Sequence, residues 1–401
     1  MKLRAARLGG AFLVVALIGF VSGLYVDQVF SGSPFLPYLA QHSVGRVDTT
    51  ELQQAIQVIQ ANYVDANIDP AKLSHGTLQG LVASLNDPFS AYFDPAQYKH
   101  LQDSLQGQYS GIGIYLTFSA GYPVISGTVP DSPAAKAGLQ AGDQIVKVDD
   151  KDMKGVTSDQ ATAAIQGPNG SKVTLAINRS GKALTFTLIR AEIHVASVRS
   201  AVIGDQVLYV RIYQFGATTS KEFADILASG LRGAKGVVLD LRDDGGGYIS
   251  AADDVISEFV TSGETFELRG RNGSVERHVV GTQHAAPSIP LVVLVNANSA
   301  SASEIVAGSL QVHNRAKLVG TTTFGKGSVQ LDFPLNDGSD VHLTIKRWFL
   351  SNGVTIDHKG LTPDVAVTLA SPNDEFDVTK PDVGYAKDAQ LNAALKALTA
   401  G

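Results

Sequence analysis

The sequence predicts a mixed α/β protein with a compact β-rich domain inserted before a larger α/β core, behind an N-terminal membrane-anchor helix. Three observations lead to this prediction. Short β-rich runs dominate residues 106–190, whereas buried strand patterns alternate with helical ones through residues 191–370. An uncharged segment stands at the N-terminus. The chain has 401 residues, 44% of them hydrophobic, which is enough for two or three domains with real cores.

The N-terminal segment has the pattern of a membrane anchor. Lys2, Arg4 and Arg7 precede an uncharged stretch that runs from Leu8 to Val26. At about 1.5 Å per residue such a helix is close to the thickness of a bilayer core. We predict an uncleaved anchor over residues 1–26, with its positive end in the cytoplasm; a cleaved signal peptide is the alternative. Either way, the rest of the chain is expected in the cell envelope, in the periplasm or another extracytoplasmic space.

Composition excludes several classes of protein. The chain carries 32 Lys and Arg against 38 Asp and Glu, a net charge of −6, so a general nucleic-acid-binding surface is not expected. It has no cysteine, which removes disulfides, thiolate nucleophiles and cysteine-ligated zinc. It also has no His-Glu-x-x-His motif, so a zinc peptidase has no support.

The first half of the chain is expected to pass from linker to helices to β-structure. Residues 27–48 read as a linker, and residues 49–105 as mostly helical, with Asp87-Pro88 as a break. In the β-rich domain, helices are expected over 132–137 and 158–165. The strands expected there cover 112–118, 124–129, 144–148, 173–178 and 184–189.

The second half is expected to form a largely parallel sheet covered by helices. Its helices are predicted over 220–231, 249–259 and 301–313. Its strands are predicted over 207–213, 236–241, 290–295 and 317–320. Residues 371–401 read as a polar tail that ends in a short amphipathic helix with Leu391, Leu395 and Leu398 on one face.

A serine lies where a predicted strand meets a predicted helix. Ser301 follows the strand 290–295 and precedes a helical run, which places it at the carboxyl edge of the sheet. The start of a helix also offers N–H groups and a positive dipole end to an oxyanion. A structural explanation is open as well, because Ser301-x-x-Glu304 has the spacing of a capping box.

A glycine-punctuated loop with one lysine comes next. Lys326 can act as a general base only if its pKa falls from about 10.4 by roughly 3 units, which burial can achieve. We expect Phe324 and Val329 to provide apolar cover. The alternatives are a solvated loop lysine and a phosphate loop, Gly320-x-x-x-x-Gly325-Lys326. The phosphate loop is disfavoured, because Gly327 replaces the required Ser or Thr and a strand pattern follows.

These segments, together with the glycine turn Asp240-Leu-Arg-Asp-Asp-Gly-Gly-Gly247, resemble the carboxy-terminal processing proteases of family S41. These are Ser–Lys endopeptidases with an inserted PDZ domain. The resemblance rests on Ser-Ala-Ser301-Ala-Ser-Glu-Ile and Phe-Gly-Lys326-Gly-x-x-Gln330, and it covers roughly residues 50–370. The interval of 25 residues from Ser301 to Lys326 agrees with the family, which favours Ser301 over Ser299 and Ser303 as nucleophile.

The resemblance implies a role for each matching residue. The implied roles are nucleophile for Ser301, general base for Lys326, orientation of the lysine for Gln330, and oxyanion hole for the N–H groups of Gly246 and Ala302. This sequence departs from the family at Asp244, where Asn is usual, and at Gly245, where Pro is common. The oxyanion glycine is therefore placed less firmly than Ser301 and Lys326.

The β-rich domain resembles a PDZ domain. Its carboxylate-binding loop and strand match Tyr109-Ser-Gly-Ile-Gly-Ile114, and its helix and following turn match the segment from Asp131 to Asp143. In such domains loop N–H groups capture a C-terminal carboxylate while the peptide adds as a strand. The residues implied to bind substrate are Gly111, Ile112, Gly113 and Ile114.

The resemblance implies an exported serine endopeptidase that cuts proteins near their C-termini without a metal or cofactor. Its parts are a helical protease region over 49–105, a PDZ domain over 106–190, a protease core over 191–370 and the tail. Expected partners are protein C-termini, the membrane through the anchor, a second copy of the chain through residues 49–105, and an adaptor protein. In residues 49–105, however, the Leu and Ile stripe is more simply explained as core.

Two other functions stay open at this point. One is a catalytically inactive protease-like scaffold whose PDZ domain tethers the C-termini of envelope proteins. The other is a Ser–His–Asp triad that uses His278, His284 or His313, although none of these lies in a motif.

Overall fold

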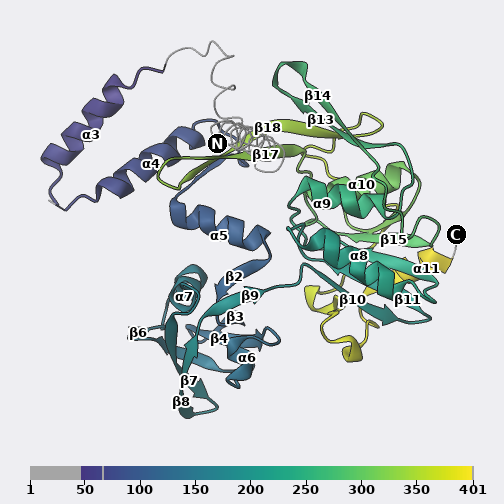
Figure 1. The fold of residues 1–401 in the computed structure, drawn as a ribbon, viewed down its shortest axis with the longest axis horizontal. Helices are drawn as coiled ribbons and strands as arrows, with labels where there is room; N and C mark the ends of the chain where they lie inside the picture. The colour runs from purple at the N-terminus through teal and green to yellow at the C-terminus, as the bar shows by residue number, and fades with distance from the viewer. Residues whose placement is uncertain (1–46, 66, 400–401) are drawn as a thin grey trace, which may run out of the picture. The chain divides into compact units, whose positions relative to one another are not determined.

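The computed structural model describes residues 47–65 and 67–399, and elements carry the labels of Figure 1. The predicted anchor and nearly all of the predicted linker lie outside the described residues. Among the helices of the described ranges, none has the length and apolar character needed to cross a bilayer. The chain forms two compact units. Of the described residues, one unit contains those up to Tyr98 with Gly270–Asn272 and Ser328–Arg347, and the second contains the remaining segments.

The first unit combines two helices with a small antiparallel sheet. The helices are α3 (Thr50–Asn62) and α4 (Pro70–Ala83), and Asp69 caps α4 by accepting a hydrogen bond from the N–H of Ala71. Strand β18 (Asp340–Leu350) pairs with β17 (Ser328–Pro334) and with β1 (Ala91–Phe93). No side chain of α3 is buried, so the interpretation of its apolar stripe as core is wrong for the described structure.

The second unit contains the β-rich domain, which helix α5 (Pro95–Leu105) precedes along the chain. Its main sheet has the order β3-β4-β5-β7-β8, with β6 paired to β5, and all pairs are antiparallel. These strands are β3 (Ile114–Ser119), β4 (Tyr122–Thr128), β5 (Gln144–Val148), β6 (Lys151–Asp152), β7 (Lys172–Arg179) and β8 (Lys182–Ile189). The helices are α6 (Pro133–Lys136) and α7 (Ser158–Ile165), and β2 (Gln108–Gly111) pairs with β9 (Ala191–His194).

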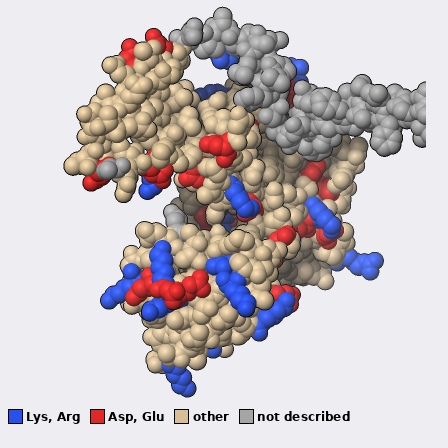
Figure 2. Space-filling view, turned by 60° about the vertical axis from the view of Figure 1, so that its left-hand side comes forward, with Lys and Arg blue, Asp and Glu red and all other residues tan. Residues whose placement is uncertain are grey.

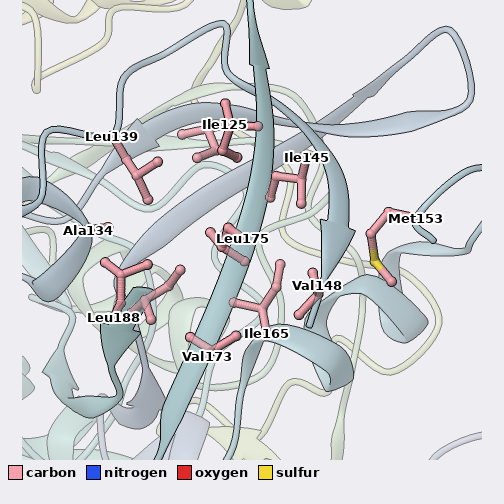
Figure 3. Packing of buried hydrophobic residues seen from close by; sticks show 12 residues of the cluster. Ile125, Ala134, Leu139, Ile145, Val148, Met153, Ile165, Val173, Leu175 and Leu188 are labelled. Atoms are coloured by element: carbon pink, nitrogen blue, oxygen red, sulfur yellow. The ribbon is translucent and has the colours of Figure 1, made fainter. Parts of the chain in front are cut away.

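The core of this domain explains its strand pattern. Every second residue of β7 is buried: Val173, Leu175 and Ile177. Val173 and Leu175 belong to the same buried cluster as Ile125 and Ile145 (Figure 3). A strand that is buried on one face alternates apolar and polar residues, and this alternation is the pattern that predicted β7 from the sequence.

A six-stranded sheet forms the core of the region predicted to be α/β, residues 191–370, in the order β10-β11-β12-β15-β16-β19. Strand β10 is antiparallel to β11, and the remaining pairs are parallel. The strands are β10 (Val198–Ile203), β11 (Val207–Ile212), β12 (Gly236–Asp240), β15 (Leu291–Val295), β16 (Lys317–Gly320) and β19 (Val365–Ala366). Every residue of β12 and β15 is buried, as in parallel strands covered on both faces.

Helices join these strands, and a further hairpin lies in the same unit. The helices are α8 (Thr219–Gly230), α9 (Ile249–Ser257) and α10 (Ala302–Val312), and the hairpin is β13 (Glu264–Gly270) with β14 (Val275–Val279). Short 3₁₀ turns lie at Arg271–Gly273, Pro372–Asp374 and Pro381–Val383. Figure 2 shows basic and acidic side chains interspersed on the face that it presents, in line with the charge balance of the sequence.

The tail is an integral part of the core. Helix α11 (Ala389–Thr399) packs against β12, β15 and β16, and its Leu391 and Ala394 are fully buried. Just before it, Asp388 forms an ion pair of 3.0 Å with the buried guanidinium of Arg242. The predicted amphipathic helix therefore exists, but it covers the sheet rather than ending a free polar tail.

Candidate active site

Ser301 occupies the turn between β15 and α10 in a strained backbone conformation. Its φ is 55° and its ψ −116°, a region that non-glycine residues rarely adopt. The side chain is half-buried, and the residue caps the N-terminus of α10. Backbone strain of this kind is found where a fold holds a functional side chain in a fixed position.

The two neighbouring serines have structural tasks. Ser299 and Ser303 are both fully buried. The hydroxyl of Ser299 donates to the carbonyl of Leu241 at 2.7 Å, and that of Ser303 donates to the carbonyl of Asp244 at 3.0 Å. Both bonds tie the serine-rich turn to the glycine turn that follows β12. Because the hydroxyls of Ser299 and Ser303 are buried and engaged in these bonds, the geometry agrees with the choice of Ser301 as nucleophile.

Lys326 lies in the loop between β16 and β17, and neighbouring groups fix its backbone. Its carbonyl accepts a hydrogen bond of 2.8 Å from the indole of Trp348, which is fully buried. A Cβ on Gly325 would lie 2.8 Å from the backbone nitrogen of Gly360, and one on Gly327 would lie 2.6 Å from the Cβ of Asp357. Glycine is therefore required on both sides of the lysine.

The apolar residues next to Lys326 are only partly buried. Phe324 is 55% exposed and Val329 is half-buried, so their shielding of the lysine stays a prediction. The backbone N–H of Phe324 donates to the carbonyl of Ser299 at 3.0 Å, which ties the lysine loop to the serine turn. Lys326 itself is half-buried.

Glu304 joins the serine turn to the lysine loop. Its carboxylate accepts hydrogen bonds from the N–H groups of Ser301 (3.0 Å), Gly325 (2.7 Å) and Lys326 (2.9 Å), and from the hydroxyl of Thr323 (2.5 Å). The side chain is fully buried, and burial raises its pKa, while these donors oppose the rise. The bond from Ser301 is the glutamate half of the capping box that the spacing predicted.

Gly246 approaches the serine turn closely. Its φ is 96°, and an added Cβ would lie 2.8 Å from both the backbone nitrogen of Ala302 and the Cβ of Ser301. The two residues with predicted oxyanion N–H groups therefore lie side by side next to Ser301. Gly247, with φ 145°, is held by a bridge to Phe215.

Asp244 engages one of these N–H groups. Its Oδ1 accepts a hydrogen bond of 2.8 Å from the N–H of Gly246, while its Oδ2 has no hydrogen-bond partner among the described residues. The carboxyl is fully buried, and burial raises its pKa to about 7. In this arrangement the Gly246 N–H points at a carboxylate, so an oxyanion would have to compete with Asp244 for it.

The predicted peptide site of the β-rich domain is a pocket between β3 and α7. Gly111, Ile112, Gly113 and Ile114 all line it, together with Tyr109, Leu116, Thr162, Ile165 and Gln166. Strand β3 lies at one end of the sheet order, so one of its edges is open to a further strand. An apolar pocket beside an open strand edge suits an extended peptide.

Comparison with known proteins places the chain in a family. Residues 206–367 match the model of peptidase family S41, 124–179 that of the PDZ domain, and 39–96 that of the activating protease CtpB N-terminal domain. The carboxy-terminal processing protease CtpB of Bacillus subtilis is 34% identical over 353 residues, covering 86% of this chain and 71% of the relative. The chain belongs to peptidase family S41.

Other relatives agree with this assignment. The carboxy-terminal-processing protease of Bartonella bacilliformis is 39% identical over 324 residues, covering 78% of this chain and 74% of the relative. A crystal structure from Bacteroides fragilis, described as that of a putative S41 protease, shares the fold, with a TM-score of 0.55 at 19% identity over 86% of this chain and 96% of that one. The predicted enzyme class is thus confirmed: the chain is a serine peptidase with an S41 core and a PDZ domain.

Gln330, the third predicted S41 catalytic residue, lies on β17 in the first unit. Its amide donates to the hydroxyls of Ser328 and Thr344, both at 2.9 Å. Its role in orienting Lys326 stays a prediction, as do the roles of the other predicted site residues.

The alternative sites considered from the sequence receive no support. The imidazoles of His278, His284 and His313 contact the carboxylate of Asp253 and the carbonyls of Ser257 and Ser309, respectively. None of these partners belongs to the Ser301 turn. After Lys326 the chain continues as strand β17 rather than the helix that a phosphate loop requires.

Proposed function

We propose that this S41 peptidase is an exported endopeptidase that cleaves proteins near their C-termini with a Ser301–Lys326 dyad. The observation that carries the proposal is the Glu304 carboxylate, which accepts the N–H of Ser301 at 3.0 Å and that of Lys326 at 2.9 Å. A single side chain thereby holds the backbones of the nucleophile and the base at one place, as proton transfer between the two side chains requires.

The dyad would act through a neutral lysine. Lys326 takes the proton from the Ser301 hydroxyl as the oxygen attacks the peptide carbonyl. The N–H groups of Ala302 and Gly246 hold the tetrahedral oxyanion, and collapse of this intermediate expels the amine, which takes the proton from Lys326 and leaves the lysine neutral again. Water, deprotonated by the same lysine, then hydrolyses the acyl-enzyme and restores Ser301.

The PDZ domain would select the substrate. A C-terminal carboxylate binds the N–H groups of the loop at Gly111–Gly113, and the preceding residues add to the edge of β3. The pocket lined by Ile112, Ile114 and Ile165 favours an apolar side chain at the substrate's C-terminus. The charge pattern of residues 1–26 supports a membrane anchor and an extracytoplasmic location, and the exposed apolar side chains of α3 support self-association. We also propose an adaptor protein as a partner, on the basis of the family resemblance alone.

The runner-up is a protease-like scaffold without activity that tethers C-termini. One observation favours it: the Gly246 N–H is engaged by Asp244 rather than open to an oxyanion. The complete set of Ser301, Lys326 and Gln330 favours the active enzyme instead.

The deciding experiment follows the intact mass of an unfolded model protein with an apolar C-terminus. The chain from residue 27 onward is compared with its Ser301→Ala and Lys326→Ala variants, and with Lys317→Ala as a control at an exposed lysine. We expect fragments from the unsubstituted protein and the control, and none from the other two. Near-normal cleavage by Lys326→Ala would refute the dyad. Binding that requires the free C-terminus, with no cleavage by any of them, would favour the scaffold.

A further inference from the structure

A cluster of three metal-ligating side chains lies on the β17–β18 hairpin. Asp332 of β17 stands opposite His342 of β18 in the strand register. Asp340 precedes His342 by two residues, so both side chains leave the same face of β18. One ligand atom from each of the three lies within 4.8 Å of the other two.

Asp340 is the unusual member of this cluster. The residue is fully buried, yet neither oxygen of its carboxyl has a hydrogen-bond partner among the described residues. Burial and the negative charge of Asp332 raise its pKa to about 7, while His342 and the nearby backbone N–H groups of Phe333 and Val341 oppose that rise. A buried carboxyl that makes no well-formed hydrogen bond is costly unless a proton or a cation compensates it, so Asp340 indicates a missing positive charge.

The ligand set points to a particular class of cation. One imidazole nitrogen and two carboxylate oxygens suit Zn²⁺ and neighbouring first-row divalent ions, whereas Ca²⁺ and Mg²⁺ prefer oxygen ligands alone. Two ligands of one such ion lie at most about 4.2 Å apart, twice a bond of about 2.1 Å. The three ligand atoms lie within 4.8 Å of one another, so an ion requires them to approach by only a few tenths of an ångström in most pairs.

We propose that Asp332, Asp340 and His342 bind one first-row divalent cation, with Zn²⁺ as the best match, and that the ion ties β17 to β18. The side chains of Asp332 and His342 are 31% and 24% exposed, which leaves a route for the ion and room for water as a fourth ligand. His342 Nδ1 now lies 2.5 Å from Asp332 Oδ1. The ion replaces the proton shared by these two atoms, and that proton passes to solvent.

The test is a titration of the purified full-length chain, treated with EDTA and dialysed, with ZnCl₂ followed by calorimetry. Co²⁺ absorption serves as a second readout of coordination. We expect one equivalent to bind, and His342→Gln or Asp340→Asn to weaken binding at least about tenfold, since even residues behind metal ligands affect affinity by that much. His194→Gln is the matched control, because it removes an exposed histidine that lies beside a single carboxylate, Glu192. This control should bind Zn²⁺ as the unsubstituted protein does.

The outcomes separate clearly. Absence of binding by the unsubstituted chain, or equal affinity in both site variants, would overturn the proposal. Because His342 is partly exposed, His342→Gln keeps the test valid if Asp340→Asn is misfolded, which circular dichroism will reveal. Loss of binding in His194→Gln alone would place the ion elsewhere and likewise overturn it.

Discussion

Glu304 links the two loops of the proposed dyad, although its carboxylate has no part in the proposed chemistry. It accepts four hydrogen bonds, three of them from backbone N–H groups of the serine turn and the lysine loop. Such a buried acceptor acts as a positioning residue: it sets the place of Ser301 and Lys326 through their backbones.

Replacing Glu304 tests this positioning role. Glu304→Gln turns an acceptor into an NH₂ group that faces N–H donors, so we expect a loss of about 1–3 kcal/mol in stability and at least about a tenfold fall in kcat/KM. Glu222→Gln is the matched control, because Glu222 accepts the N–H groups of Ser197 and Val198 in another part of the core. Urea unfolding and peptide cleavage measure both quantities. An equal fall in kcat/KM for the two variants would contradict the positioning role.

The carboxyl of Asp244 should make stability depend on pH. Its pKa is raised to about 7 in the folded protein, against about 3.9 in an unfolded chain, so the folded state holds the proton more tightly. The contribution of this carboxyl to the free energy of unfolding is therefore complete below about pH 4 and is lost as the pH rises to about 7. Above that pH the free energy of unfolding no longer changes because of this group. The pKa difference sets a limit of roughly 4 kcal/mol on the loss.

The Asp244→Asn variant isolates this contribution. Urea unfolding at pH 5 and pH 8 should show the Asn variant gaining stability relative to the unsubstituted protein as the pH rises. Asp205→Asn, at an 83% exposed side chain, should show no such gain. A difference between Asp244→Asn and the unsubstituted protein that does not change with pH would show that Asp244 ionises normally.

At the scale of elements, α3 exposes an apolar surface to solvent. Leu52, Val58 and Ile59 are 43%, 54% and 41% exposed. We expect Ile59→Glu to abolish self-association of the chain, because a charge would be buried in the contact. Gln54→Glu, on the same helix at an exposed polar position, should leave association unchanged. Sedimentation velocity measures the oligomeric state of each variant. If the unsubstituted protein is monomeric, α3 is not a contact between copies of the chain.

Helix α11 should contribute strongly to the stability of the core. Leu391 is fully buried between this helix and the sheet, so Leu391→Ala is expected to cost about 2–5 kcal/mol. Lys396→Ala, at an exposed position of the same helix, should change stability by less than about 0.5 kcal/mol. Thermal and urea unfolding measure the difference. A small effect of Leu391→Ala would mean that α11 is only loosely attached.

At the scale of the whole molecule, the PDZ domain should set the preference for a free C-terminus. A peptide with a free carboxylate should be cleaved about 10–100 times faster than its amidated form, because charge-assisted hydrogen bonds to the loop are lost in the amide. Deletion of residues 106–190 should bring this ratio close to one. A ratio that survives the deletion would place carboxylate recognition outside the PDZ domain.

The sequence by itself determined the family and most regular elements, because these depend on short-range patterns. The period of two along 173–178 and the run 290–295 predicted β7 and β15, and the motifs around Ser301 and Lys326 predicted the serine peptidase. Strands β1, β13, β14 and β18 were not predicted. β1 has only three residues and β14 is polar along most of its length, whereas Val341, Leu343 and Ile345 of β18 alternate with polar residues, a signal that the prediction missed.

Only the tertiary structure decided which distant groups meet. The hydrogen bond from Ser303 to the carbonyl of Asp244, the three donors that the lysine loop offers to Glu304 and the ion pair from Asp388 to Arg242 depend on how loops from different strands come together. A capping-box spacing marked Glu304, but only as a local helix start. A hydrogen bond between residues many positions apart leaves no period in the chain, so its partner becomes known only once the sheet has assembled.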